Sequence, residues 1–309
     1  MRNIFIEELE RSCGPGKNIF LMTGDLGFKL FDRFRKKFPG RFLNVGIAEP
    51  NMIGIAAGLG LSGKKVYCYS MIPFLITRCL EHIKIDICYN KANVRLVGAG
   101  CGFTYGVEGV THHAMEDLAI MRPIPNMTIV APGDPAEVSA CVKASVKYEG
   151  PMFIRLGKNC PPAVYSSTKI DFKIGKGTTV LKNGNDVCIL AAGSMLYNAK
   201  LASEALCKKG FGVTLISMHT IKPLDKMLIE ECAGKFDYMV SVEEHSIIGG
   251  LGSAIAEVLS EISYKGAFKR IGIPDEFNHY VGKMDYLHEK YGLTAEKISE
   301  KIINFIEGK

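Results

Sequence analysis

The sequence predicts an α/β protein with two doubly wound domains, each built on a mostly parallel sheet, the second domain being the smaller. Short apolar runs alternate with helical patterns along the 309 residues, and this alternation is typical of parallel sheets with helices on both faces. Composition changes over residues 158–185, where Pro161-Pro162 and three glycines indicate a linker. We therefore expect domains at residues 1–165 and 166–309, near the usual size of roughly 150 residues.

In the first domain, short runs of apolar and β-branched residues predict strands, and longer amphipathic or small-residue patterns predict helices. The chain opens directly into a helical pattern. Strands are expected at residues 18–23, 42–46, 65–71, 94–98, 127–131 and 152–156, and helices at residues 29–38, 51–61, 74–89 and 136–148.

In the second domain, the linker is expected to run into an edge strand before residue 185. The same alternation then resumes and ends in an amphipathic helix. Strands are expected at residues 187–192, 213–217, 238–243 and 270–273, and helices at residues 198–209, 225–233, 251–262 and 295–307.

Composition excludes several classes of function. The net charge is +6, but the basic residues are spread along the chain, and the densest run, residues 33–37, is expected to be a solvated helix face. No apolar run approaches the length of a membrane span. The ten cysteines include no C-x-x-C pair, which argues against a zinc site. We expect a cytoplasmic protein with buried thiols, without nucleic-acid or membrane partners and without a metal of its own.

Residues 44–59 form the first segment that carries chemistry. A strand ends, Glu49 follows, and a helix rich in glycine and alanine begins. Open α/β sheets bind ligands at the carboxyl ends of their strands, which is where this carboxylate is expected. From the spacing alone, an ordinary first-turn glutamate, favoured by the helix dipole, is the better explanation. The small residues of the helix would let another backbone approach closely.

Two further segments are expected at the same sheet edge. Phe74 follows a strand and is placed to stack on a flat ring, or to pack in the core. Arg78 lies four residues further on, on the same helical face as Phe74. It is expected either to take part in the site or to form a surface ion pair. Residues 98–117 form a glycine-dense loop with the adjacent histidines His112 and His113. Such a loop permits close approach of a ligand.

A fourth segment places basic residues at the end of another strand, over residues 153–159. Arg155 and Lys158 are candidates for gripping a phosphate there, and a solvated loop is the alternative.

Together these segments resemble the pyrimidine-binding domain of the transketolase family. The shared order is G-I-A-E, an aromatic residue at a strand-to-helix step, Y-G-x-x-G-x-T-H-H-A-x-E-D-L-A, P-N-M and P-x-D, in register over residues 4–158. The remainder resembles the transketolase C-terminal domain, through the pieces at residues 193–194, 221–225, 243–245 and 249–252. The likeness covers nearly the whole chain and suits split transketolases, in which two polypeptides replace one.

The resemblance implies thiamine diphosphate as the cofactor. Glu49 matches the acid that shares a proton with the pyrimidine N1′ and so activates the ring, a catalytic role. Phe74 matches the aromatic residue that stacks on the aminopyrimidine. Arg78 stands where relatives carry aromatic or basic residues one turn on, and it is expected to help bind the cofactor. Asp25 is expected to contact the pyrimidine or a neighbouring subunit.

The resemblance also implies a site for sugars or sugar phosphates. His112 matches a catalytic histidine that contacts donor and acceptor hydroxyls, and His113 is expected beside it. Glu108 falls where an aspartate lies near the ketose hydroxyls. Lys158 falls where an arginine commonly holds the phosphate, and the change loses bidentate geometry. Gly100 replaces a further histidine found in many full-length members.

Full-length members begin with a diphosphate-binding domain marked by a G-D-G motif. Its nearest counterpart here, residues 24–26, reads G-D-L. The resemblance therefore implies an N-terminal partner subunit that binds the diphosphate and Mg²⁺ (or Ca²⁺), an α2β2-like assembly, and inactivity of this chain alone.

The implied reaction is transfer of a two-carbon ketol unit from a ketose to an aldose. Two rival enzymes stay open. 1-Deoxy-D-xylulose-5-phosphate synthases usually read D-G-x-T-H-x-G where this chain reads E-G-V-T-H-H-A at residues 108–114. The β subunit of the first component of a 2-oxo-acid dehydrogenase would lack the T-H-H-A-x-E-D pattern. A non-catalytic subunit of the same fold is the alternative from another class. The glycine turn at residues 249–252 is expected to serve packing more than a nucleotide, and His245 has no expected role.

Overall fold

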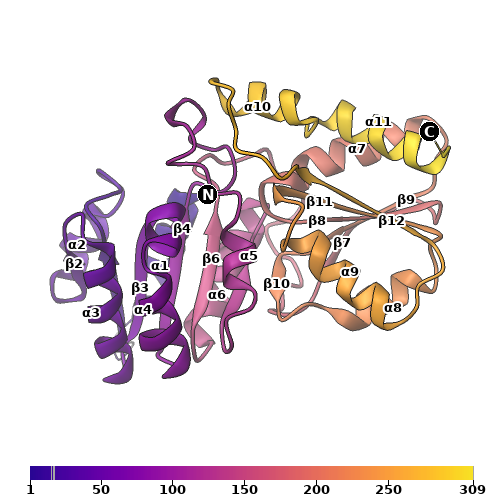
Figure 1. Ribbon diagram of the computed structural model, residues 1–309. Helices are drawn as coiled ribbons and strands as arrows, with labels where there is room; N and C mark the ends of the chain where they lie inside the picture. Colours follow the sequence, from indigo (N-terminus) through magenta and orange to yellow (C-terminus); the bar gives the residue numbers. More distant parts are fainter. Residues whose placement is uncertain (15, 17, 309) are drawn as a thin grey trace.

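The computed structural model describes residues 1–14, 16 and 18–308, and in this part of the chain two α/β units stand side by side (Figure 1). The first contains a seven-stranded sheet in the order β10-β5-β6-β4-β3-β1-β2. Its first six strands in sequence are parallel, whereas β10 comes from the second unit and runs antiparallel to β5. The strands are β1 (Ile19–Thr23), β2 (Phe42–Asn44), β3 (Lys65–Met71), β4 (Val94–Ala99), β5 (Thr128–Val130), β6 (Met152–Leu156) and β10 (Thr220–Lys222).

Helices cover both faces of this sheet because successive strand residues point to opposite sides. Tyr67 and Tyr69 of β3 pack against Phe5 on one face, where α1 and α6 lie. Val66 and Cys68 join the cluster that contains α3 and α5 on the other face. The helices are α1 (Arg2–Ser12), α2 (Asp32–Lys37), α3 (Glu49–Leu61), α4 (Leu80–His82), α5 (Asp117–Met121) and α6 (Pro135–Lys147), with short turns η1 (Pro39–Arg41) and η4 (Gly106–Glu108).

The prediction of one continuous helix over residues 74–89 is wrong in detail, although the segment is helical. This segment consists of two wide π-helical pieces, η2 (Pro73–Thr77) and η3 (Ile83–Tyr89), on either side of the short α4. The Arg78 N–H donates to the Pro73 carbonyl five residues earlier, at 3.4 Å. The sequence pattern shows only that the segment is helical, whereas tertiary packing sets the width of its turns. Such π turns occur frequently at functional sites.

The second unit contains a five-stranded sheet in the order β12-β11-β8-β9-β7. As predicted, an edge strand follows the linker. This strand, β7, runs antiparallel to its neighbour β9. The strands are β7 (Thr178–Lys182), β8 (Val187–Ala191), β9 (Val213–Ser217), β11 (Tyr238–Ser246) and β12 (Ala267–Ile273). The helices are α7 (Leu196–Lys208), α8 (Lys226–Ala233), α9 (Leu251–Glu261), α10 (Met284–Tyr291) and α11 (Ala295–Ile306), with the short turn η5 (Gly193–Met195). The predicted class, two α/β domains with mostly parallel sheets, is confirmed.

The two units share buried structure. One cluster of buried side chains extends from the α3 and α5 side of the first sheet to α8 and α9 of the second unit. The predicted buried thiols include Cys68 and Cys188, which lie in this cluster. Among the described residues, no helix is long and apolar enough to cross a membrane.

Arg155 of β6 lies at the junction between the units. Its Nε and Nη2 donate to the two carboxylate oxygens of Asp117 at 2.7 and 3.1 Å, and Nη2 also donates to the carbonyls of Ala114 and Glu244. Arg155 and Asp117 are both almost fully buried. Both sequence alternatives for this arginine, a phosphate grip and a solvated loop, are therefore wrong.

We expect Arg155→Met to lower the free energy of unfolding by about 3–5 kcal/mol, because it leaves the buried Asp117 carboxylate without its partner. Urea unfolding followed by circular dichroism measures the change. The matched control is Arg35→Met, which removes an exposed pair with Asp32 and should cost about 1 kcal/mol or less. Equal losses in the two variants would contradict the assignment.

Candidate active site

Glu49 is the first residue of α3 and lies at the carboxyl edge of the first sheet. It is 1% exposed. The Ser70 hydroxyl, near the end of β3, donates to Glu49 Oε1 at 3.0 Å. Gly24, just after β1, leaves room for this carboxylate, since a Cβ there would lie 3.3 Å from the same oxygen. Three neighbouring chain segments thus shelter one acid where open α/β sheets place their ligands.

Arg78 and Phe74 complete the surroundings of this acid. Arg78 Nη1 donates to Glu49 Oε2 at 2.8 Å, so the surface ion pair considered for this arginine is formed with Glu49 itself. The guanidinium carbon also lies 4.6 Å from the centroid of the Phe74 ring. The structure therefore brings together three of the four residues expected at the pyrimidine.

Asp25, the fourth, is exposed and lies one residue beyond Gly24. Its backbone N–H donates to Asn44 Oδ1, and its carboxylate accepts from Asn44 Nδ2, both at 2.9 Å. These bonds join the ends of β1 and β2. Asp25 therefore lies at the expected sheet edge, and its contact with a pyrimidine or another subunit stays a prediction.

His112 lies close to Phe74 on the glycine loop. The two rings meet edge to face, with centroids 5.4 Å apart. His112 Nδ1 lies 2.9 Å from the Thr111 hydroxyl, and its Nε2 lies 3.5 Å from Glu108 Oε2. The His112 and Glu108 side chains are both partly exposed. One imidazole and one carboxylate are thus available to a polar ligand near the Phe74 ring.

His113 has different surroundings from its neighbour. It is buried, its Nε2 donates to the Gly106 carbonyl at 2.8 Å, and its ring packs edge to face on Phe103. Burial lowers the pKa of His113, which keeps the ring neutral. Through these contacts His113 stabilises the loop. They give no support to the predicted contact between His113 and a substrate, which stays a prediction.

Tyr105 was missed as a site residue. Its ring lies 5.9 Å from the His112 ring, and Lys158 Nζ lies 4.7 Å above it. Tyr105 therefore lies between His112, the residue expected to contact sugar hydroxyls, and Lys158, the residue expected to contact a phosphate. Gly100 has a φ of 87°, and the Tyr105 ring occupies the space that a side chain at position 100 would need. The only sequence signal was an aromatic residue within a glycine-rich loop.

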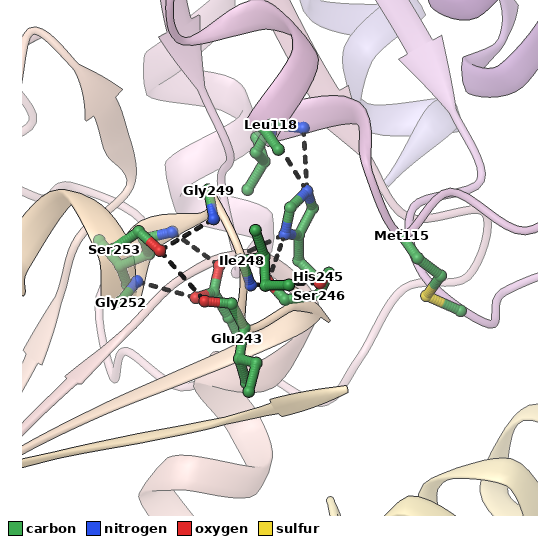
Figure 2. A network of polar contacts seen from close by, with 12 residues as sticks. Met115, Leu118, Glu243, His245, Ser246, Ile248, Gly249, Gly252 and Ser253 are labelled. Atoms are coloured by element: carbon green, nitrogen blue, oxygen red, sulfur yellow. Dashed lines mark hydrogen bonds and ion pairs between the residues drawn. The ribbon is translucent and has the colours of Figure 1, made fainter. Parts of the chain in front are cut away.

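Figure 2 shows the contacts of Glu243 and His245, the first and last residues of the E-E-H motif at the end of β11. The Glu243 carboxylate accepts the backbone N–H groups of Leu251 and Gly252 at 2.7 and 2.8 Å, at the N-terminus of α9. The glycine turn therefore binds a carboxylate of its own chain, as its packing interpretation expected. His245 Nε2 accepts the N–H of Leu118 in α5 at 3.2 Å, which links the second unit to the first.

Glu244 fixes the base of the glycine loop. It accepts the Phe103 N–H at 2.9 Å and a bond from the Ser194 hydroxyl, and it pairs with His288 Nε2 at 2.7 Å. Gly102 has a φ of 56°, and Glu244 fills the space where its side chain would lie. The second unit thereby determines where the loop begins.

The comparisons with known proteins agree with this geometry. The family "Transketolase, pyrimidine binding domain" matches residues 1–162, and "Transketolase, C-terminal domain" matches residues 175–298. The chain belongs to the transketolase family.

Three relatives indicate the branch of this family. One subunit of the apulose-4-phosphate transketolase of Phocaeicola vulgatus is 37% identical over 99% of this chain and 97% of its own length. A solved split-gene transketolase in an inactive β4 tetramer is 37% identical, covers 99% of this chain and 97% of its own, and has a TM-score of 0.89. A 1-deoxy-D-xylulose-5-phosphate synthase of Methylacidiphilum infernorum is 33% identical over 98% of this chain, but over only 48% of its own length. The two relatives of the same extent as this chain are thus a transketolase subunit and a split-gene transketolase.

No group of three or more His, Cys, Asp or Glu side chains that could hold a metal ion occurs in the described part of this transketolase-family chain. Glu49 is bonded to Ser70 and Arg78, and Glu108 lies beside His112.

The Glu244–His288 pair should make stability depend on pH. Burial opposes both charges. Attraction to His288 and hydrogen bonds from His288, Ser194 and the Phe103 N–H nevertheless lower the pKa of Glu244 below 4.5, and Glu244 raises the pKa of His288 above 6.5. The stabilisation is therefore full between pH 4.5 and 6.5. It is lost as pH rises through the raised pKa of His288 and as pH falls through the lowered pKa of Glu244.

We expect His288→Gln to flatten the decline in the free energy of unfolding on the alkaline side of this window. Urea titrations at a series of pH values measure the profile, and Glu244→Gln should flatten it in the same way. A wild-type profile in both variants would show that the pair is not formed.

Proposed function

We propose that this chain is the pyrimidine-binding subunit of a two-chain transketolase that uses thiamine diphosphate. The observation that carries the proposal is the sheltered Glu49 carboxyl at the carboxyl edge of a parallel sheet, paired with an Arg78 guanidinium that lies over the Phe74 ring. The reaction would transfer a two-carbon ketol unit from a ketose to an aldose. When bound, thiamine diphosphate supplies the electron sink for breaking the carbon–carbon bond beside a ketose carbonyl.

The residues present fit the aminopyrimidine end of this cofactor. Phe74 offers an aromatic face for stacking, and Glu49 offers an acid within reach of the same face. The Ser70 bond to Oε1 orients the acid. Glu49 is 1% exposed, so the burial of the acid together with the ring would exclude water from a proton shared with the ring nitrogen N1′.

The residues around Tyr105 fit a hydroxylated substrate. His112 and Glu108 can exchange hydrogen bonds with sugar hydroxyls near the Phe74 ring. Lys158 lies over Tyr105 and would attract a phosphate as a point charge instead of through the fork of an arginine. We therefore propose sugars or sugar phosphates as substrates.

We further propose that a separate N-terminal subunit holds the diphosphate and its Mg²⁺ or Ca²⁺, in an α2β2-like assembly, and that this chain alone is inactive. The split form of the relatives supports this. So do Phe28 and Ile47, which are 91% and 78% exposed and stand within four residues of Gly24 and Glu49 along the chain. Large exposed apolar side chains near one site are typical of a surface that a partner covers. A cytoplasmic location and a domain boundary at residues 165/166 remain part of the proposal.

The test is to purify this chain with and without a diphosphate-binding subunit, which is sought first in the adjacent gene. Mixtures receive thiamine diphosphate and Mg²⁺, then either a ketose donor with an aldose acceptor, or pyruvate. Ketol exchange only in the two-chain mixture is the expected result. Turnover of pyruvate with an aldehyde would favour the synthase, oxidative decarboxylation of 2-oxo acids would favour the dehydrogenase subunit, and no turnover of any substrate would favour a non-catalytic role.

We expect Glu49→Ala to lower ketol transfer by the two-chain complex at least about 100-fold, the usual loss when an acid–base group is removed. Initial rates at saturating cofactor measure the effect. Glu81→Ala removes a mostly exposed carboxylate from the neighbouring α4 and should leave the rate unchanged. Near-wild-type turnover in the Glu49 variant would refute the role of this acid.

A further inference from the structure

The Arg78 guanidinium makes the two contacts that the aminopyrimidine ring would need. It is planar, it lies 4.6 Å from the Phe74 centroid, and its Nη1 donates to Glu49 Oε2 at 2.8 Å. An incoming ring would have to stack on this phenyl face and place a nitrogen within about 3 Å of the same carboxylate. The guanidinium thus lies between the aromatic face and the acid.

We propose that Arg78 occupies the aminopyrimidine position in the isolated chain and must swing away when the cofactor ring enters. The inference rests on the proposed function. It gives Arg78 a role opposite to the direct cofactor contact that the family resemblance implies, because the arginine competes for the ring's place instead of holding the ring in it.

The exposures of the two partners show which one moves. Glu49 is 2% exposed in its side chain and is fixed by Ser70, whereas the Arg78 side chain is 45% exposed. Arg78 lies at the end of the wide turn η2, on a long and flexible stem. It can therefore move into water without disturbing the core, while the acid keeps its position.

The exchange also changes what Glu49 can do. A guanidinium has only donors and stays charged, so the pair with Arg78 uses the ionised carboxylate. Sharing a proton with a ring nitrogen requires a proton between Glu49 and that nitrogen. An unpaired carboxylate buried in this place would be unfavourable, so Arg78 also satisfies Glu49 until a ring replaces it.

The test measures binding of 4-amino-5-hydroxymethyl-2-methylpyrimidine, the ring without its diphosphate, to the isolated chain by isothermal titration calorimetry. Arg78→Met keeps the length of the side chain but cannot pair with Glu49. We expect it to bind the pyrimidine about tenfold more tightly than the wild type, since an ion pair no longer competes. Arg78→Lys, which retains the charge but not the planar group, should lie between them.

Two controls define the outcome. Arg35→Met, on α2, should bind like the wild type, and thermal unfolding should show that Arg78→Met is folded. Adding Glu49→Ala to Arg78→Met should abolish the gain if the gain comes from the freed acid. Weaker or unchanged binding by Arg78→Met, or no detectable binding by any variant, would overturn the proposal.

This outcome can be separated from failure of the proposed function. If the two-chain complex transfers ketol units and depends on Glu49, but Arg78→Met binds the pyrimidine no better, only the role of Arg78 is wrong. If Arg78→Met binds the pyrimidine more tightly but the complex transfers no ketol unit, the site binds the ring and the reaction has been misassigned.

Discussion

The buried charges at the junction of the two units are the constraint on which the candidate site depends. Arg155 reaches Asp117 and the Glu244 carbonyl, and Glu244 reaches the Phe103 N–H. Each of these groups is buried, so each needs its partner in place. The base of the glycine loop is consequently set from the second sheet, even though the loop belongs to the first. This explains how the C-terminal domain bears on a site whose acid, Glu49, lies in the other domain.

The same arrangement divides the loop into a fixed base and a more accessible tip. Gly102 and Ala114 exchange backbone hydrogen bonds at 3.0 and 3.2 Å, and His113 ties the interior of the loop to Gly106. Val107 and Val110 near the tip are largely exposed. His112 therefore projects from a supported base toward Phe74, while exposed apolar side chains remain available to a covering subunit. Support from one side and exposure on the other suit a site completed by two chains.

Much of this could be predicted from the sequence. The apolar runs located every strand of both sheets except β7 and β10, because most strands of a covered parallel sheet are buried on both faces. The edge strand β7 was expected only from its place after the linker. Glu49 and Phe74 could be placed at one edge because parallel strands end on the same side. The three residues of β10, the polar α10 and the π turns around Arg78 gave no comparable pattern. Ser70, Tyr105 and Glu244 were missed as contributors because their contacts come from tertiary packing, and Glu244 reaches Phe103 across 141 positions of the chain.

The motif around Glu49 identifies the residue, but it does not show which group the carboxylate pairs with in the folded chain. The G-I-A-E string places an acid at a sheltered edge, but burial alone would leave its charge unfavourable. In the chain by itself, a partly exposed arginine four positions beyond Phe74 supplies both a counter-charge and a planar surface. If the proposed function holds, this buried acid also needs a partner before the cofactor ring arrives. Arg78 pairs with Glu49 from the solvent side, so it can move away again. The fully buried pair Arg155–Asp117 cannot separate in this way. The difference in burial therefore distinguishes a replaceable contact from a permanent one.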